Sequence, residues 1–365
     1  MKKIRFGIVG YGKVAGLHVR ALAGLEACEL AAVCGRDQTK AEAFAAHHGI
    51  AAFTSIEQMV SQKALDAVMI ASPHLQHREH SISALEAGAH VLVEKPMALS
   101  VEACDAMISA ANTCGRLLGV ISQRRWFPAV RRVREAIAAG KIGVPVLGQV
   151  LMLGWRDEAY YRSDPWRGSW SGEGGGVLAN QAPHQLDIIQ WLMGPIEEVF
   201  SYWDNVNHPY IEVEDTAIAI FRCQNGALGN ILVSNSQKPG IYAKVHVHGR
   251  SGASVGVQTD GGAMFVAGMS SIVEPAWNDI WTIPGEEGLP LQWRNEDEAL
   301  FSRIDPTAYF HALQFADFAD AIRNGRAPVV DGREGRKSVA LIEAIYRSGR
   351  EHIPVKLPDE MASSG

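Results

Sequence analysis

The feature that most constrains the fold of this chain is a glycine-rich turn near its beginning. Ile4 to Val9 is a short apolar run typical of a buried strand, and Gly10-Tyr11-Gly12-Lys13-Val14-Ala15 follows it directly. A helical pattern continues to Ala23. Gly10 permits a tight turn, Gly12 lets a ligand approach the backbone, and Ala15 lets the helix lie close to the strand. The order predicts a strand, turn and helix whose N-terminus offers N–H groups to a pyrophosphate.

The alternation of short apolar runs and helical patterns continues beyond this first unit. Each run suits a buried parallel strand, and each helical pattern supplies the crossover that parallel strands need. The expected strands are Leu30–Cys34, Ala67–Ala71 and Val91–Val93, and the expected helices are Lys40–His47, His80–Ala87 and Val101–Asn112. We therefore predict an α/β fold in which residues 1–122 form an N-terminal Rossmann dinucleotide-binding domain.

The pattern changes after residue 122, where runs that alternate apolar and polar residues follow one another with few helices between them. Strands without crossover helices pair antiparallel. The expected strands are Val146–Leu153, Ala217–Phe221, Leu228–Val233, Lys244–His248, Ala253–Val257 and Ile353–Lys356, and the expected helices are Pro128–Ala139, Val177–Leu192, Tyr309–Arg323 and Glu334–Arg347. We predict that residues 123–358 form a C-terminal α/β domain for substrate binding and oligomerisation, with a large, open, mostly antiparallel sheet. Its C-terminal helix can pack back on the first domain, and residues 359–365 are expected to form a tail.

Composition argues against several other classes of protein. The net charge of −6 supplies no positive field for a phosphate backbone, so no nucleic acid partner is expected. No run reaches the ~18 apolar residues of a membrane span, so no membrane partner is expected. The five cysteines form an odd set without C-x-x-C spacing, which indicates a reducing cytoplasm. His, Cys and carboxylate residues show no three-ligand zinc spacing, so we expect no metal.

The end of the second expected strand bears on the choice of coenzyme. An acidic residue there binds the ribose 2′-hydroxyl of NAD, whereas an arginine accepts the 2′-phosphate of NADP. In Cys34-Gly35-Arg36-Asp37, a glycine, Gly35, occupies the position where the acidic residue is expected, and Arg36 follows it. We predict NADP or NAD as the cofactor, with NADP slightly favoured. Two alternatives stay open, because Asp37 can fold back to the ribose and Arg36 can be a solvated surface charge.

Four separated motifs occur together in this chain. They are Gly10-Tyr11-Gly12, Ser72-Pro73-His74, Glu94-Lys95-Pro96 and Gly174-Gly175-Gly176-Val177-Leu178-Ala179-Asn180-Gln181-Ala182-Pro183-His184-Gln185-Leu186-Asp187. Their order resembles the glucose-fructose oxidoreductase / inositol dehydrogenase / MocA (Gfo/Idh/MocA) family, and the resemblance runs over essentially the whole chain. It implies a Rossmann domain followed by an α/β domain with the substrate on one side of an open sheet. It also implies that Lys95 contacts the nicotinamide ribose and the substrate, ahead of a cis proline bond.

The expected cofactor contacts come from the ends of several strands. They are Gly10, Gly12, Lys13, Val14, Arg36, Asp37, Ser72, Pro73, His77, Glu94 and Lys95. For Ser72, Pro73 and His77 the expectation rests on the resemblance alone.

The resemblance further implies an acid/base histidine with an aspartate four residues earlier. His184 matches the histidine, but Asn180 stands at the aspartate position. Histidine titrates close enough to neutral pH to exchange a hydroxyl proton in both directions, and a cation at Lys95 would stabilise the alkoxide. Asn180 cannot take a proton, so it can only position a hydroxyl or orient His184. Alternatively, His184 satisfies a buried carbonyl, and Asp187 either orients His184 or bonds a neighbouring loop.

A loop rich in tryptophan, tyrosine and arginine runs from Trp155 to Trp170. Aromatic faces suit the C–H surfaces of sugar rings, and guanidinium groups suit hydroxyls and carboxylates; alternatively, the tryptophans cap the sheet. The residues expected to contact substrate are Lys95, Arg124, Trp155, Arg156, Tyr161, Trp166, Arg167, Asn180 and His184. For Arg124, as for Arg125 and Trp126, packing at the domain junction is an equal alternative.

These features predict an NAD(P)-dependent oxidoreductase that moves a hydride between the nicotinamide and a hydroxyl-bearing carbon. The expected substrate is a sugar, cyclitol, sugar acid or glycoside. Two other functions stay open. The resemblance also implies a redox-assisted enzyme that cleaves or eliminates a glycoside and recycles its NAD(P), and the other is a non-catalytic cofactor-sensing regulator, for which Asn180 is the only indication. An open sheet with one uncovered face predicts a homodimer or homotetramer formed through that sheet.

Overall fold

The computed structural model describes residues 2–261 and 274–358 of the 365-residue chain. The chain divides into two compact units. Unit 1 comprises Met1–Gln123 and Thr307–Val339, and unit 2 comprises Arg124–Pro306 and Ala340–Gly365. The expected tail, residues 359–365, lies outside the described residues. Among the helices that the structure describes, none combines the length and apolar character needed to span a bilayer.

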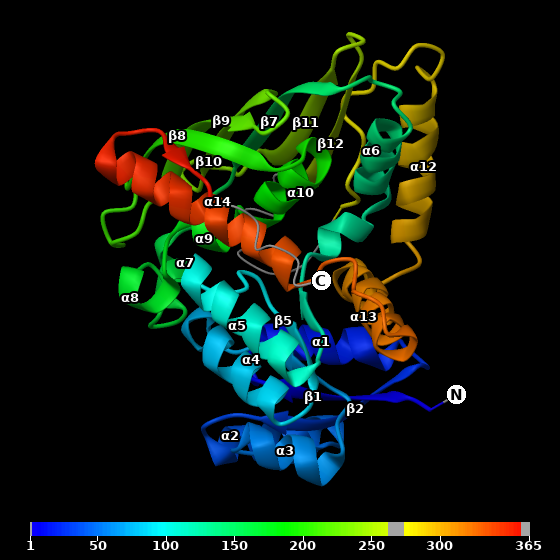
Figure 1. Cartoon of the computed structure of the whole chain (residues 1–365), viewed down its shortest axis with the longest axis vertical. Coiled ribbons are helices and arrows are strands. Elements are labelled where there is room, and N and C mark those ends of the chain that lie inside the picture. The colour runs from blue at the N-terminus through cyan, green and yellow to red at the C-terminus, as the bar shows by residue number, and fades with distance from the viewer. Residues whose placement is uncertain (1, 262–273, 359–365) are drawn as a thin grey trace. The chain divides into compact units, whose positions relative to one another are not determined.

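Unit 1 contains, in its described part, a six-stranded parallel sheet with the order β3-β2-β1-β4-β5-β6 (Figure 1). The strands are β1 Ile4–Val9, β2 Cys28–Cys34, β3 Ala51–Phe53, β4 Ala67–Ile70, β5 His90–Val93 and β6 Leu118–Val120. The helices are α1 Lys13–Ala23, α2 Gln38–His48, α3 Ile56–Lys63, α4 His77–Glu86, α5 Val101–Cys114 and α13 Pro306–Asn324. This strand order is that of a doubly wound dinucleotide-binding fold and confirms the predicted Rossmann fold.

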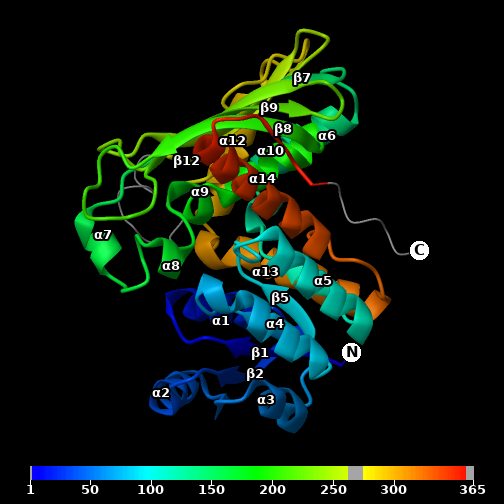
Figure 2. The same ribbon diagram turned by 60° about the vertical axis from the view of Figure 1, so that its left-hand side comes forward.

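Side chains of β1 alternate between two helical layers, as a strand with both faces buried requires. Phe6 and Ile8 are fully buried in a core shared with α1 and α13, where the ring of Phe6 meets Phe315 edge-on at 5.4 Å. On the other face, a Cβ on Gly7 would lie 2.9 Å from Met59 of α3. Helices α4 and α5 pack side by side (Figures 1 and 2). The sheet is therefore covered on both faces, and its strand ends are left to carry loops.

Unit 2 contains a sheet with the order β12-β11-β7-β10-β9-β8-β13 among its described residues. The strands are β7 Pro145–Leu153, β8 Ile196–Asp204, β9 Thr216–Cys223, β10 Leu228–Ser234, β11 Tyr242–Gly249, β12 Ser254–Gly261 and β13 Val355–Lys356. Strands β7 and β10 pair parallel, and the other neighbours pair antiparallel. The predicted mostly antiparallel sheet is thus confirmed.

One face of this sheet packs against helices and the other is exposed. Helices α6 Pro128–Ala138 and α10 Pro183–Met193 contact β12, β11 and β7 (Figure 1). A Cβ on Gly148 would lie 3.0 Å from Ile189 of α10, which identifies the covered face. In β9, Phe221 is buried on that face, whereas Ile218 and Ile220 on the opposite face are exposed.

The prediction of a single helix over Val177–Leu192 is wrong, because two helices occupy that segment. Helix α9 covers Val177–Asn180, and α10 begins at Pro183. Proline lacks the N–H that would continue a helix and is favoured in the first turn, so Pro183 starts a new one. The remaining helices are α7 Glu158–Arg162, α8 Trp170–Glu173, α12 Leu289–Phe301 and α14 Gly332–Glu351.

Candidate active site

The glycine turn after β1 has the geometry of a dinucleotide-binding loop. Gly10 has a φ of +109°, and a Cβ there would lie 2.6 Å from the carbonyl oxygen of Ala71. Gly12 caps the N-terminus of α1 without a side chain, and a Cβ on it would meet no atom within 4 Å. The first turn of α1 contains no acidic residue. Open space, free N–H groups and the positive end of the helix dipole together fit a pyrophosphate.

The residues after β2 divide into a helix cap and an exposed cation. Asp37 caps α2, because its Oδ1 accepts a hydrogen bond from the Lys40 backbone N–H at 3.1 Å, and its Oδ2 lies 3.7 Å from Lys40 Nζ. Arg36 is exposed and makes no hydrogen bond or ion pair within the described part of the chain. In this structure the Asp37 carboxylate is therefore engaged with α2, whereas Arg36 and the exposed Lys13 carry positive charge at the site.

Glu94 fixes the backbone at Lys95 from a buried position. Its Oε2 accepts a hydrogen bond from the Lys95 backbone N–H at 2.9 Å, and its Oε1 accepts one from His18 Nε2 at 2.8 Å. Burial alone would raise the pKa of Glu94, but the hydrogen bond and charge of His18 outweigh it and lower the pKa to about 2. The Lys95–Pro96 bond is cis, as the resemblance implies. Both oxygens of Glu94 thus support Lys95 and α1.

His77 joins the loops that follow β4 and β5. Its Nδ1 lies 2.8 Å from the carbonyl oxygen of Pro96, and its Nε2 lies 2.9 Å from that of Ser72. The side chain of His77 is completely buried. Burial also lowers its pKa against the raising effect of the two carbonyls. His77 positions the loop that presents Ser72 and Pro73.

In unit 2, a buried glutamate anchors the glycine segment ahead of α9. Glu214 accepts hydrogen bonds from the backbone N–H groups of Gly176 at 2.8 Å and Leu178 at 2.9 Å, and from the Tyr346 hydroxyl at 2.9 Å. A Cβ on Gly176 would lie 1.8 Å from the Glu214 carbonyl oxygen, so only glycine fits there. Burial raises the pKa of Glu214 to about 7.

A second buried glutamate contacts Asn180 directly. One oxygen of Glu173 accepts a hydrogen bond from Asn180 Nδ2, and the other accepts one from the Gly168 backbone N–H at 2.7 Å. Asn180 Nδ2 also lies 3.2 Å from the hydroxyl of Tyr160, to which Arg167 donates at 2.6 Å. Asn180 is therefore held between a carboxylate and a phenol.

His184 lies in the first turn of α10 and is nearly buried. On the same helix, both oxygens of Asp187 accept hydrogen bonds from Arg125, at 2.8 and 2.6 Å. Of the two roles left open for Asp187, the structure thus shows a bond to the segment before α6. Arg124, expected at the substrate, pairs with the buried carboxylate of Asp260.

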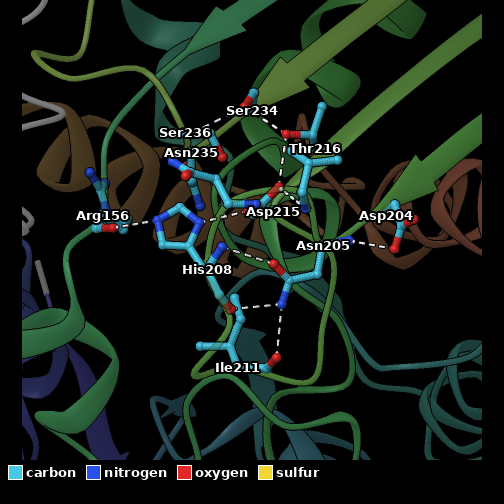
Figure 3. A network of polar contacts seen from close by, with 12 residues as sticks. Arg156, Asp204, Asn205, His208, Ile211, Asp215, Thr216, Ser234, Asn235 and Ser236 are labelled. Atoms are coloured by element: carbon cyan, nitrogen blue, oxygen red, sulfur yellow. Dashed lines mark hydrogen bonds and ion pairs between the residues drawn. The ribbon is translucent and has the colours of Figure 1, made fainter.

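The aromatic loop is built around a buried histidine and aspartate (Figure 3). His208 Nδ1 lies 2.7 Å from Asp215 Oδ2, and His208 Nε2 lies 2.8 Å from the carbonyl oxygen of Arg156. The ring of Trp155 lies against the ring of His208, with 5.4 Å between the two ring centroids. Burial would raise the pKa of Asp215, but the His208 contact and further hydrogen bonds lower it to about 2. This pair fixes the backbone that presents Arg156.

The residues of that loop differ in accessibility. Four of them are partly exposed: Trp155, Arg156, Trp166 and Arg167. The guanidinium carbon of Arg167 lies 4.4 Å from the ring centroid of Tyr160 and 4.4 Å from that of Trp166. Tyr161 is buried with Ile211 and Val213 and helps to shape the loop.

Sequence reasoning missed Glu173, Tyr160, Glu214, His208 and Asp215. Two signals were available: Glu173 stands directly before the glycine run, and Glu214 and Asp215 are consecutive acids between the apolar Val213 and the strand β9. Lys95 belongs to unit 1, and His184 and Asn180 belong to unit 2. No group of His, Cys, Asp and Glu residues suited to a metal ion occurs among the residues that the structure describes.

Two family models match the chain. The model described as "Oxidoreductase family, NAD-binding Rossmann fold" matches residues 4–122, and the "GFO/IDH/MocA C-terminal domain" model matches residues 130–255. The two matches fall on unit 1 and unit 2, respectively.

Named relatives span nearly the whole chain. The 1,5-anhydro-D-fructose reductase of Ensifer adhaerens is 29% identical over 352 residues, covering 94% of this chain and 96% of the relative. The scyllo-inositol 2-dehydrogenase (NAD(+)) of Bacillus subtilis (strain 168) is 24% identical, covering 100% of this chain and 99% of the relative. The crystal structure of the WlbA dehydrogenase from Bordetella pertussis in complex with NADH and UDP-GlcNAcA is 31% identical, with a TM-score of 0.85 and coverage of 98% of this chain and 99% of that one. The chain is an NAD-binding oxidoreductase and belongs to the Gfo/Idh/MocA family.

Proposed function

We propose that this enzyme transfers a hydride between NADP or NAD and a hydroxyl-bearing carbon of a sugar, cyclitol, sugar acid or glycoside. His184 is the general base and Lys95 its electrostatic partner. The observation that carries the proposal is the support built around both segments: Glu94 fixes the backbone at Lys95, and Glu173 fixes Asn180 four residues before His184. The sugar and inositol enzymes among the named relatives support the substrate class.

The chemistry divides between the cofactor and the protein. When bound, the nicotinamide accepts or supplies the hydride. His184 removes the proton of the substrate hydroxyl during oxidation and returns it during reduction. Lys95 stabilises negative charge on the same oxygen. Asn180 donates or accepts a hydrogen bond without proton transfer.

We assign substrate selection to Trp155, Arg156, Trp166 and Arg167. All four side chains are partly exposed, and aromatic rings and guanidinium groups suit the C–H surfaces and hydroxyls of a sugar ring. The bonds of Arg156 and Arg167 to their own loop support a preformed arrangement.

We propose a preference for NADP over NAD. Position 35 carries no acid, Asp37 is engaged as the cap of α2, and Arg36 and Lys13 offer two exposed cations for a 2′-phosphate. The 31% identical WlbA dehydrogenase was crystallised with NADH, the coenzyme without a 2′-phosphate. The dissociation constants of NADPH and NADH must therefore be measured on this chain.

We also propose that a second copy of this chain covers the exposed face of the unit 2 sheet. Tyr202, Ile218, Ile220 and Leu228 are exposed on neighbouring strands, and such a face is typical of a symmetric interface. Ile220→Asp should lower the mass in light scattering relative to the wild type, and Gln224→Asp, outside the strands, should not. A wild type that is monomeric at all working concentrations contradicts the proposal.

We propose a reducing cytoplasm as the setting of the enzyme. None of the five cysteines, all of which lie in the described part of the chain, forms a disulfide, and four of them are buried. Fractionation of cells that express the chain tests this assignment.

The experiment that tests the catalytic proposal follows nicotinamide reduction with NADP and with NAD, across sugars, inositols, sugar acids and glycosides. His184→Ala should lower kcat by about 10² to 10⁴. His47→Ala, an exposed histidine on α2, is the matched control and should leave kcat unchanged. Normal turnover by His184→Ala would overturn the assignment.

Two outcomes would redirect the proposed function. Cleavage of a glycoside without net reduction of the coenzyme pool would identify the redox-assisted reaction. Tight coenzyme binding without any turnover across the panel would favour the regulator.

A further inference from the structure

The aromatic ring of Tyr11 occupies the space that a side chain at position 35 would need. A Cβ on Gly35 would lie 2.2 Å from Cε1 and 2.6 Å from Cδ1 of Tyr11. Both values are far below van der Waals contact, so any larger residue at position 35 requires the ring to move. Tyr11 lies between Gly10 and Gly12 in the glycine turn after β1, called the phosphate loop below, and Gly35 directly follows β2.

Backbone hydrogen bonds hold these two residues beside each other. The Gly10 N–H donates to the carbonyl oxygen of Cys34 at 2.8 Å, which ties the phosphate loop to the end of β2. The Gly35 N–H donates to the carbonyl oxygen of Phe53 at 3.1 Å, which ties the next residue to β3. The close approach of ring and glycine therefore belongs to the sheet framework and not to one loose loop.

The position concerned is where dinucleotide-binding folds carry the acid that reads the ribose 2′-hydroxyl. Here a phenol ring takes the place of that acidic side chain. The nearest carboxylate along the chain, Asp37, caps α2, and the side chains of Arg36 and Lys13 are exposed.

We propose that Tyr11 is a coenzyme-specificity residue, which together with Gly35 keeps an acid away from the ribose and leaves the site to a 2′-phosphate. The inference rests on the proposed coenzyme preference and deepens it. It assigns the discrimination to a pair of residues from two loops, so a single substitution at position 35 does not reverse it.

A double-mutant cycle on the full-length chain tests the pairing without knowledge of the substrate. The dissociation constants of NADPH and NADH are measured by calorimetry for the wild type, Tyr11→Ala, Gly35→Asp and Tyr11→Ala/Gly35→Asp. We expect Gly35→Asp alone to leave NADH affinity within about threefold of the wild type, and the double variant to gain about tenfold or more, the usual value of a hydrogen bond to a carboxylate. Tyr11→Ala/Gly35→Asn, which has the shape of the double variant without its charge, should not gain. Thermal unfolding of each variant checks that it is folded.

Each result decides the matter. A full gain by Gly35→Asp alone, or strictly additive changes around the cycle, overturns the role of Tyr11. A wild type that prefers NADH, combined with a non-additive cycle, refutes the proposed NADP preference but supports the pairing. A wild type that binds neither coenzyme overturns both.

Discussion

Glu173 accepts a hydrogen bond from the side-chain amide of Asn180. The resemblance implies an aspartate at position 180, and the structure places a buried carboxylate directly against the amide that stands there. The second oxygen of Glu173 is held by the Gly168 backbone N–H at 2.7 Å, so the carboxylate is fixed at both ends. The negative charge that position 180 lacks is supplied from α8.

This relationship predicts that Glu173→Gln impairs turnover while coenzyme binding stays unchanged. The substitution removes the charge and turns one accepting oxygen into a donor, which costs about 1.5–3 kcal/mol for a hydrogen bond to a charged group. We expect kcat to fall about tenfold or more, because the orientation of Asn180 is lost. Steady-state kinetics as a function of pH, together with the dissociation constant of NADPH, measure the effect.

An exchange of the two side chains separates positioning from loss of folding. Asn180→Asp alone brings two carboxylates together and should impair the enzyme, since like charges in contact disfavour each other's ionised form. Glu173→Gln/Asn180→Asp restores one acid and one amide in reversed order and should recover activity to within a few-fold of the wild type. Full activity of Glu173→Gln, or an exchange variant no better than the single ones, would refute the positioning role.

A second prediction concerns the buried pair of His18 and Glu94. Glu94→Gln leaves two buried donors, His18 Nε2 and the Lys95 backbone N–H, without a charged acceptor, so it should lower the free energy of unfolding by about 1.5–3 kcal/mol. The pKa of Glu94 is lowered to about 2, so its stabilising contribution is present above its ordinary pKa of 4.5 and is lost as pH falls from 4.5 towards 2. Urea unfolding at pH 7 measures the loss, with Glu86→Gln at the exposed end of α4 as the control. Equal stability of the two variants would contradict the pair's contribution.

The sequence predicted those elements whose burial is periodic. Strand β4 is buried at all four positions, and β9 alternates buried residues with exposed or partly exposed ones, so both carry a clear pattern. Helix α12 was not predicted, because Asp297 is its only described residue that is buried and no apolar stripe marks it. Strand β8 was not predicted either, since Glu197 and Glu198 interrupt its alternation. In neither case do the local positions of apolar residues mark the element.

Candidate site residues could be named from the sequence where they stand within a short motif. Gly10, Lys95 and His184 each stand in such a motif. Their supports do not: His18 is 76 residues from Glu94, and Glu214 is 38 residues from Gly176. Contacts of this kind depend on how strands and helices pack, and a single sequence does not reveal them. The adjacent acids Glu214 and Asp215 were the visible sign of one support.

Those two adjacent acids lead to a prediction about pH. Burial raises the pKa of Glu214 to about 7, whereas hydrogen bonds lower that of Asp215 to about 2. The contribution of Glu214 is fully present below its ordinary pKa of 4.5 and is lost as pH rises from 4.5 to about 7, by about 3 kcal/mol in all. The contribution of Asp215 is present above its ordinary pKa of 3.8 and is lost as pH falls from there towards 2.

Urea unfolding of the wild type, Glu214→Gln and Asp215→Asn from pH 3 to pH 8 separates the two contributions. The wild-type free energy of unfolding minus that of Glu214→Gln should fall as pH rises from 4.5 to 7, because only the wild type must ionise a buried acid there. The same difference for Asp215→Asn should stay level over that range and fall only below pH 4. A difference for Glu214→Gln that rises with pH would show that the N–H groups of Gly176 and Leu178 outweigh burial and keep Glu214 ionised.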